Sequence, residues 1–157
     1  NRVDGPTVLA LTRQNLPQLR TTVPNDSPCS HGAYELVAAQ GDAKVSLFAS
    51  GSEVQIAVEA QKQLAGRGHA TRVVSVPSLE LLLAQPAERQ NAIIGNAPVK
   101  VAVEAAVRFG WDAVIGPDGG FVGMASFGAS APIKDLYRHF GITPEAVVET
   151  AVKRHNG

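Results

Sequence analysis

Residues 44–54 read Lys44-Val45-Ser46-Leu47-Phe48-Ala49-Ser50-Gly51-Ser52-Glu53-Val54. The first seven residues have the length and composition of a strand, with the apolar residues Val45, Leu47, Phe48 and Ala49 between Lys44 and Ser50. Gly51 then interrupts the run, and Ser52 followed by Gln55 three residues later predicts a capping box at the start of a helix. A strand that leads through a short turn into a helix is the repeating unit of open α/β sheets.

The same alternation continues along most of the chain. Further strands are predicted at 34–38, 71–76, 99–104 and 113–116. Helices are predicted after Ser52 and at 79–83, 86–95, 132–140 and 143–152. The sequence therefore predicts an α/β fold, with an open, mostly parallel (mixed) twisted sheet of about five strands and helices on both faces.

Residues 1–31 follow a different pattern. A short apolar run at 6–13 predicts one strand, and residues 14–32 are rich in proline, asparagine and small polar residues. That composition predicts an extended linker, longer than most connections inside a compact domain. We therefore expect residues 1–31 to be the last strand of a preceding domain plus a linker, and residues 32–157 to be an α/β domain. A chain that begins at Asn1, without Met, is also expected to be part of a longer protein.

The composition excludes several classes of protein. The 157 residues are 45% hydrophobic, with a mean hydropathy of +0.02, so a sizeable core is available. The 14 basic residues balance the 14 acidic residues, so no basic field is available to bind nucleic acid or an anionic membrane. No apolar run approaches the ~20 residues of a membrane helix, and the N-terminus lacks the features of a signal peptide. The single cysteine, Cys29, suits a reducing compartment, so we expect a cytoplasmic protein.

Common catalytic motifs are absent from the sequence. It contains no G-x-x-x-x-G-K-[ST], H-E-x-x-H, G-x-S-x-G or C-x-x-C motif. The four histidines do not have the spacing of metal ligands; they are His31, His69, His139 and His155. These observations predict no catalytic residue and no metal ligand in the chain.

Three places in the sequence have features of an anion-binding site. The turn Gly51-Ser52 at a helix start would expose free amides, but it has one glycine and the capping box already explains Ser52. The stretch 116–123 is rich in glycine without the G-x-G-x-x-G pattern, which predicts a loop with positive φ angles. Arg13 is the better candidate, because strand ends in α/β domains commonly hold ligands and a guanidinium is a planar anion receptor.

Several short segments together resemble the C-terminal part of transketolase. They occur in the family's order at residues 5–16, 47–54, 72–78, 101–105, 121–124 and 127–132, and they cover nearly the whole chain. The resemblance identifies residues 5–16 with the end of that enzyme's pyrimidine-binding domain and residues 32–157 with its C-terminal domain. It implies a parent enzyme, a cytoplasmic homodimer, that transfers a two-carbon ketol unit between sugar phosphates.

The resemblance also implies cofactors that this chain does not hold by itself. Transketolase uses thiamine diphosphate with Mg²⁺ or Ca²⁺, and its Gly-Asp-Gly…Asn motif has no counterpart here, because Gly41-Asp42-Ala43 lacks the third glycine and a suitably placed asparagine. The family's substrate histidines and catalytic glutamate also have no counterpart. The resemblance therefore implies that the chain alone is inactive and that residues 32–157 support the dimer and the substrate face.

One functional residue of the family matches this sequence. The arginine of a Ser-Arg-Gln-Asn segment binds the substrate phosphate in transketolase, and Arg13 in Thr12-Arg13-Gln14-Asn15 corresponds to it. Thr12 replaces the usual serine and keeps the hydroxyl group. Arg13 is the only site residue that the resemblance assigns to this chain, and its role would be to bind phosphate.

Two alternative interpretations of the sequence remain. The chain could be a non-catalytic assembly or ligand-sensing α/β module that uses the glycine-containing loop at Phe127-Gly128-Ala129-Ser130. It could also be the C-terminal domain of a related thiamine enzyme, such as a pyruvate dehydrogenase beta subunit or deoxyxylulose-phosphate synthase. The segment Thr12-Arg13-Gln14-Asn15-Leu16-Pro17 argues against these relatives.

Overall fold

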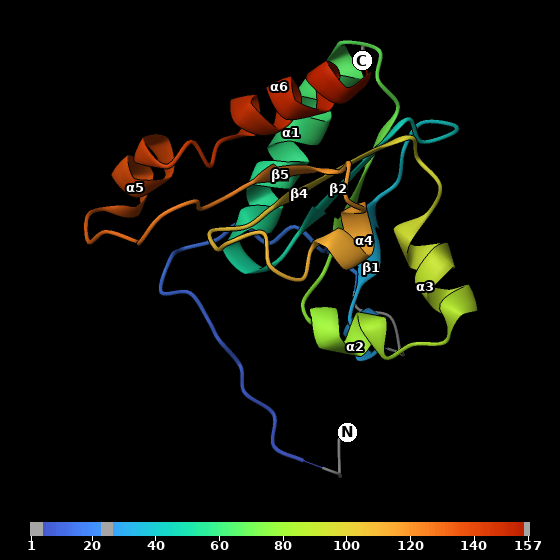
Figure 1. Ribbon diagram of the computed structural model, residues 1–157, viewed down its shortest axis with the longest axis horizontal. Helices are drawn as coiled ribbons and strands as arrows, with labels where there is room; N and C mark the ends of the chain where they lie inside the picture. Colours follow the sequence, from blue (N-terminus) through green and yellow to red (C-terminus); the bar gives the residue numbers. More distant parts are fainter. Residues whose placement is uncertain (1–4, 23–26, 156–157) are drawn as a thin grey trace.

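The computed structural model describes residues 5–22 and 27–155 (Figure 1). Their strands form one five-stranded sheet in the spatial order β1-β3-β2-β4-β5. The strands are β1 (Tyr34–Val37), β2 (Val45–Ala49), β3 (Thr71–Ser75), β4 (Val99–Val103) and β5 (Gly120–Val122). Arg2 and Asp4, which contribute to the charge balance, lie outside the described residues.

The sheet is mixed and mostly parallel, as the sequence predicts. The central strand β2 runs parallel to both neighbours, with Leu47 aligned to Val73 of β3 and to Val101 of β4. Strand β5 is parallel to β4, whereas the edge strand β1 is antiparallel to β3, with a shift in register between Glu35 and Val37. The carboxyl ends of the four parallel strands therefore meet at one edge of the sheet.

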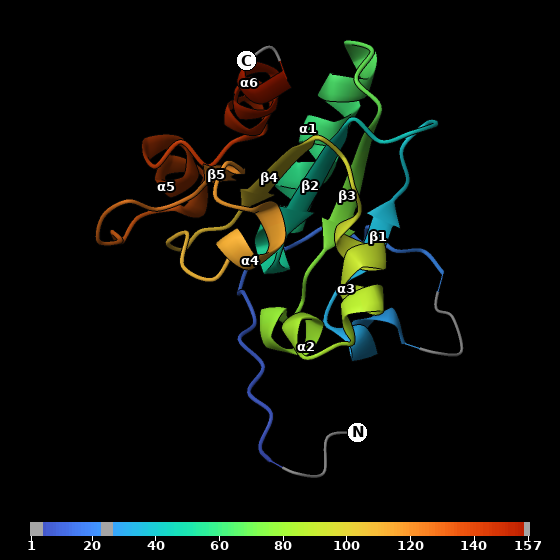
Figure 2. The same ribbon diagram turned by 45° about the vertical axis from the view of Figure 1, so that its right-hand side comes forward.

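Helices cover both faces of the sheet, which confirms the predicted α/β architecture. The helices of the described residues are η1 (Pro28–His31), η2 (Gly51–Glu53), α1 (Val54–Gly66), α2 (Leu79–Leu83), α3 (Ala87–Ile94), α4 (Asp112–Ile115), α5 (Ile133–His139) and α6 (Pro144–His155). Helices α1 and α6 pack on one face, and α2, α3 and α4 lie on the other (Figure 2). None of the helices in residues 5–22 and 27–155 has the length and apolar character needed to cross a membrane.

Strand β2 lies at the centre of two apolar cores. Leu47 and Ala49 point to the core under α1 and α6, and Phe48 between them points to the core under α2 and α4. All five residues of β2 are buried. A central parallel strand covered on both faces is mostly apolar on both faces, and the one buried polar residue of β2, Ser46, accepts a hydrogen bond from Arg72 Nε at 2.8 Å.

The predicted strand at 113–116 is wrong. Residues 112–115 form the short helix α4, and the fifth strand is Gly120–Val122. Val114 and Ile115 are both buried in the core under α2 and α4, so they pack as one side of a helical turn. An apolar run of three residues does not distinguish a strand from a helical turn, and here tertiary packing selects the turn.

The predicted capping box at Ser52 is also wrong. Ser52 lies inside η2, and its hydroxyl donates to the carboxylate of Glu53 at 2.6 Å instead of accepting a hydrogen bond from the helix backbone. Glu53, and not Ser52, is the residue that directly precedes α1, so the Ser52 hydroxyl is not at the capping position. The start of α6 is formed as predicted, since the Ala146 amide donates to Thr143 Oγ1 at 3.2 Å.

The strand predicted at 6–13 is not formed. In Figure 1 this segment runs outside the sheet, and Val8 and Leu9 are 88% and 76% exposed. An isolated extended segment has no partner for its backbone groups, so its apolar composition alone does not make it a strand.

After this segment, Arg20 lies over the ring of Tyr34, with its guanidinium carbon 5.6 Å from the ring centre.

We expect a chain that begins at Gly32 to fold without residues 1–31. Every buried residue of the two cores lies between Ala33 and Ala151, so the shorter chain keeps all of both cores. Thermal melts of residues 32–157 and of the whole chain should both be cooperative, with similar midpoints. Recovery of residues 32–157 only as unfolded material would show that the segment before Gly32 is needed for folding.

Candidate functional site

The carboxyl edge of the sheet is the place where open α/β folds usually bind ligands. Strand β2 ends beside Ser50, and β4 ends beside Glu104. Ser50 Oγ donates to Glu104 Oε1 at 2.6 Å, and the indole nitrogen of the buried Trp111 donates to Glu104 Oε2 at 2.6 Å. Glu104 therefore uses both oxygens to join the ends of two strands to the start of α4, which is a structural role.

A second group of polar side chains at this edge surrounds Glu53. Glu53 is only 5% exposed, and its Oε1 accepts hydrogen bonds from Ser52 Oγ and from the Tyr137 hydroxyl. Tyr137 comes from α5, so this contact joins two distant parts of the chain. Burial raises the pKa of the Tyr137 phenol, and the hydrogen bond to Glu53 raises it further. The phenol therefore keeps its proton and remains a donor to the carboxylate.

The predicted phosphate-binding residue, Arg13, is exposed to solvent near this group. It lies in a bend in which the Gln14 amide donates to Thr12 Oγ1 at 3.3 Å. The side-chain amide of Gln14 reaches the hydroxyl oxygen of Tyr137 at 3.5 Å. The bend that carries Arg13 therefore contacts the Glu53 group through its next residue.

A cavity of about 730 Å³ lies between this N-terminal segment and the carboxyl edge. Thr12 and Leu16 line it from the segment, and Ser52, Glu53 and Glu104 line it from the domain. Its size is within the range of small-molecule sites. However, the Glu53 carboxylate stands at the turn Gly51-Ser52, so a phosphate bound to the free amides of that turn would be repelled. This arrangement does not support the turn as an anion site.

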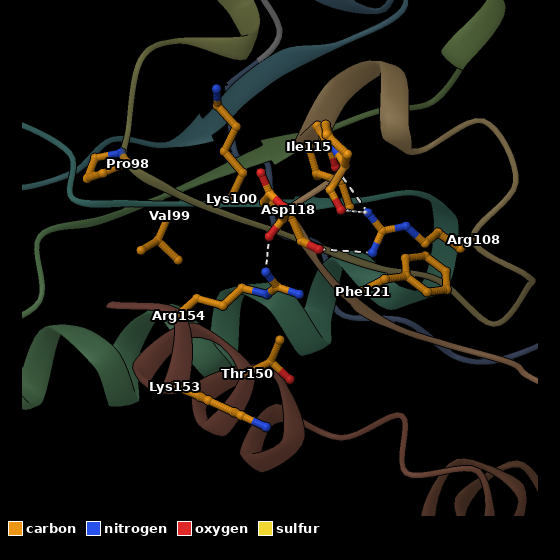
Figure 3. A pocket seen from close by; sticks show the side chains of 13 residues that line it. Pro98, Val99, Lys100, Arg108, Ile115, Asp118, Phe121, Thr150, Lys153 and Arg154 are labelled. Carbon is orange, nitrogen blue, oxygen red and sulfur yellow. Dashed lines mark hydrogen bonds between the residues drawn. The ribbon is translucent and has the colours of Figure 1, made fainter. Parts of the chain in front are cut away.

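A second cavity, of about 760 Å³, lies at the opposite edge of the sheet (Figure 3). It is bounded by the start of β4, the loop before β5 and the end of α6, and it contains four basic side chains: Lys100, Arg108, Lys153 and Arg154. In Figure 3, the two arginines extend toward the loop that carries Asp118, whereas the amino groups of the two lysines lie at opposite ends of the view.

The arginines of the second cavity are already hydrogen-bonded. Arg108 donates to the carbonyl oxygens of Gly116, Pro117 and Gly119 at 2.9–3.1 Å, and also to the Asp112 carboxylate at 2.6 and 2.8 Å. Arg154 donates to the carbonyl of Asp118. These arginines fix the loop before β5 against the rest of the domain. The predicted positive φ is found at Gly116, at 76°, whereas Gly120 belongs to β5.

The histidines do not form a metal site within the described residues. His69 and His155 have ring centres 5.0 Å apart, edge to face, and His139 packs against Phe140. Within residues 5–22 and 27–155, no three His, Cys, Asp or Glu side chains are grouped in a way that could hold a metal ion.

Sequence reasoning did not identify Glu53, Glu104 or Tyr137 as parts of this edge. Two acids carried a signal in the sequence. Glu104 directly follows a buried strand, and Glu53 lies in a turn of small residues at the carboxyl end of another. Tyr137 carried no such signal, because its spacing fits an ordinary apolar helix face.

Comparisons with known proteins place the fold in a family. Residues 32–143 match the family model of the transketolase-like C-terminal domain. A transketolase of Cereibacter sphaeroides is 49% identical over 149 residues, which are 95% of this chain and 22% of that protein. Among solved structures, the transketolase of Leishmania mexicana has a TM-score of 0.73 and 44% identity, covering 81% of this chain and 18% of its own.

A further solved structure extends the match. A Pichia stipitis transketolase, solved as a complex with sedoheptulose 7-phosphate, has a TM-score of 0.77 and 34% identity, covering 92% of this chain and 20% of its own. This chain spans about a fifth of the length of the relatives it matches. The family-model match covers most of the described α/β domain, and these relatives are transketolases. The chain therefore belongs to the transketolase family and contains its C-terminal domain.

Proposed function

We propose that this chain is the C-terminal portion of a transketolase that transfers a two-carbon ketol unit between sugar phosphates. The observation that carries the proposal is the similarity to transketolases over 95% of the chain, including the segment Thr12-Arg13-Gln14-Asn15. The Pichia stipitis relative was solved with a sugar phosphate bound, which supports the same class of substrate here.

In this proposal Arg13 binds the phosphate of the substrate. A guanidinium presents two parallel N–H groups, which match two oxygens of a phosphate in charge-assisted hydrogen bonds. Arg13 is exposed beside the cavity at the carboxyl edge, so its side chain is accessible to an anion. Binding the phosphate at a distance from the reacting carbonyl would help to orient that carbonyl for reaction.

The described residues do not fit thiamine diphosphate or its metal. Asp42 is exposed in the turn between β1 and β2, and the described residues contain no group of side chains suited to a metal ion. We therefore assign the cofactor and Mg²⁺ or Ca²⁺ to other domains of the full-length protein. The α/β domain would support a cytoplasmic homodimer and the face on which the substrate binds.

One experiment compares the full-length protein with residues 1–157. With thiamine diphosphate, Mg²⁺, a ketose phosphate and an aldose phosphate, the full-length protein should transfer the two-carbon unit and residues 1–157 should not. Calorimetric titration of residues 1–157 with the cofactor should give no saturable heat. Micromolar binding by residues 1–157 would contradict the assignment of the cofactor to other domains, and a full-length protein without transfer activity would contradict the proposed function.

A further inference from the structure

Glu53 is a buried carboxylate without a cationic partner among residues 5–22 and 27–155. Removing a carboxylate from water is unfavourable unless hydrogen bonds or a positive charge compensate it. Here the compensation comes from two neutral hydroxyl groups, those of Ser52 and Tyr137. The domain thus keeps a buried negative group whose hydrogen bonds fix the position of one phenol.

Because the Tyr137 hydroxyl has a single proton, its bond to Glu53 decides whether it donates or accepts toward a further partner. The phenol has one proton, and it donates this proton to Glu53. The lone pairs of the Tyr137 oxygen are then available, and the Gln14 side-chain amide approaches that oxygen at 3.5 Å as a donor. Glu53 therefore orients Tyr137 as an acceptor toward the N-terminal segment.

The partner on that segment is the neighbour of Arg13. Gln14 is half-buried, although the residues on either side of it are exposed. Its backbone amide also donates to Thr12 Oγ1. Gln14 therefore makes one hydrogen bond within the bend and one to the domain. A rigid peptide unit joins Arg13 to Gln14, so fixing Gln14 restricts the directions in which the Arg13 side chain can leave the bend.

We propose that Glu53 and Tyr137 are positioning residues for Arg13, which they hold through the Gln14 side chain. The proposal rests on the proposed function of Arg13 as the phosphate-binding residue. It assigns to the α/β domain an indirect part in substrate affinity, through the bend that carries Arg13. Glu53 fixes the phenol, the phenol accepts from Gln14, and Gln14 holds the bend.

The first test is Tyr137→Phe in the full-length protein. This variant keeps the ring and removes both the oxygen that accepts from Gln14 and the proton donated to Glu53. The lost bond to Glu53 lowers the stability of the domain, whereas the lost bond from Gln14 is the one that reaches Arg13. We expect KM for phosphorylated substrates to rise about two- to ten-fold, the effect of losing one neutral hydrogen bond, with little change in kcat. Substrates that lack the phosphate should show no change. Tyr34→Phe is the matched control, because Tyr34 is outside this group of side chains, and it should leave both kinds of substrate unaffected.

A second variant changes the other side of the contact. Gln14→Ala lies on the segment outside both cores, so it leaves the fold of the domain intact. It should reproduce the KM change of Tyr137→Phe, and the two changes together should have little more effect than either alone. Additive effects of the two substitutions would overturn the proposal, because residues acting through one contact are not independent.

Combining Tyr137→Phe with Arg13→Ala separates this proposal from the proposed function. If Tyr137 acts through Arg13, Tyr137→Phe should have no further effect on KM when Arg13 is already absent. If Arg13→Ala lowers activity equally on substrates with and without phosphate, the proposed phosphate-binding role of Arg13 fails and this proposal fails with it. If Arg13→Ala is specific for phosphate but Tyr137→Phe is silent or affects both kinds of substrate, only the positioning role is wrong.

Hydrogen exchange gives a readout that does not depend on activity. In the full-length protein, peptides that cover residues 8–19 should exchange faster in Tyr137→Phe than in the unaltered protein or in Tyr34→Phe. Glu53→Gln keeps an oxygen that can accept from the phenol, so its exchange should lie between the unaltered protein and Tyr137→Phe. Unchanged exchange in Tyr137→Phe would overturn the proposal.

Discussion

Arg13→Ala in the full-length protein is expected to lower kcat/KM for phosphorylated substrates roughly ten- to a hundred-fold. A charge-assisted hydrogen bond is worth about 1.5–3 kcal/mol, and the proposed phosphate contact would be present in both the ground state and the transition state. The loss should therefore appear mainly in KM. Steady-state kinetics on one donor with the phosphate and one without it measure the effect, and the donor without phosphate should be nearly unaffected.

Two further variants define the cause of that loss. Arg13→Lys should recover only part of the activity, because an ammonium group cannot form the two parallel hydrogen bonds of a guanidinium. Arg67→Ala removes another exposed arginine, located after α1, and should leave the kinetics unchanged. Equal losses in Arg13→Ala on both kinds of donor would show that Arg13 has a structural role.

The elements of the fold were predictable where they depend on residues close together in the sequence. β2 and β4 are each apolar except for one residue, Ser46 and Lys100, because both faces of the sheet are covered, so the sequence shows them clearly. The start of α6 was equally clear, because the Thr143 side chain bonds to the backbone only three residues away. Such interactions are visible in a short window of sequence.

The errors occurred where distant residues decide the structure. Helix α4 forms because the indole of Trp111 bonds to Glu104 at the end of β4 while Val114 packs into the core. Ser52 does not cap α1 because it lies inside η2 and Glu53 directly precedes α1. Its hydroxyl donates to Glu53, whose carboxylate also accepts from Tyr137, 84 residues away in sequence. No local pattern reports a contact of that range, so the Glu53 group was not predictable.

Phe48→Ala in the 157-residue chain is expected to give the largest loss of stability of the substitutions discussed here. Phe48 is 0% exposed at the centre of the sheet, in the core under α2 and α4. Removing a fully buried phenyl ring loses its transfer free energy and leaves a cavity, which together lower the free energy of unfolding by about 3–5 kcal/mol. That loss is a large part of the whole stability of an ordinary domain, so the unfolded fraction of the variant at 37 °C should rise strongly.

Phe127→Ala provides the matched control, since it deletes the same side chain from a loop position that is 98% exposed. Its free energy of unfolding should lie within about 0.5 kcal/mol of the unaltered chain, because no buried contact is lost. Urea denaturation followed by circular dichroism gives both values, and the midpoint for Phe48→Ala should fall while the slope stays the same. If the two variants lose similar stability, either Phe48 is not in the core or the Phe127 loop packs against the domain. If Phe48 is not in the core, β2 is not at the centre of the sheet, and the placement of the edge that carries Glu53 and Ser50 is also wrong.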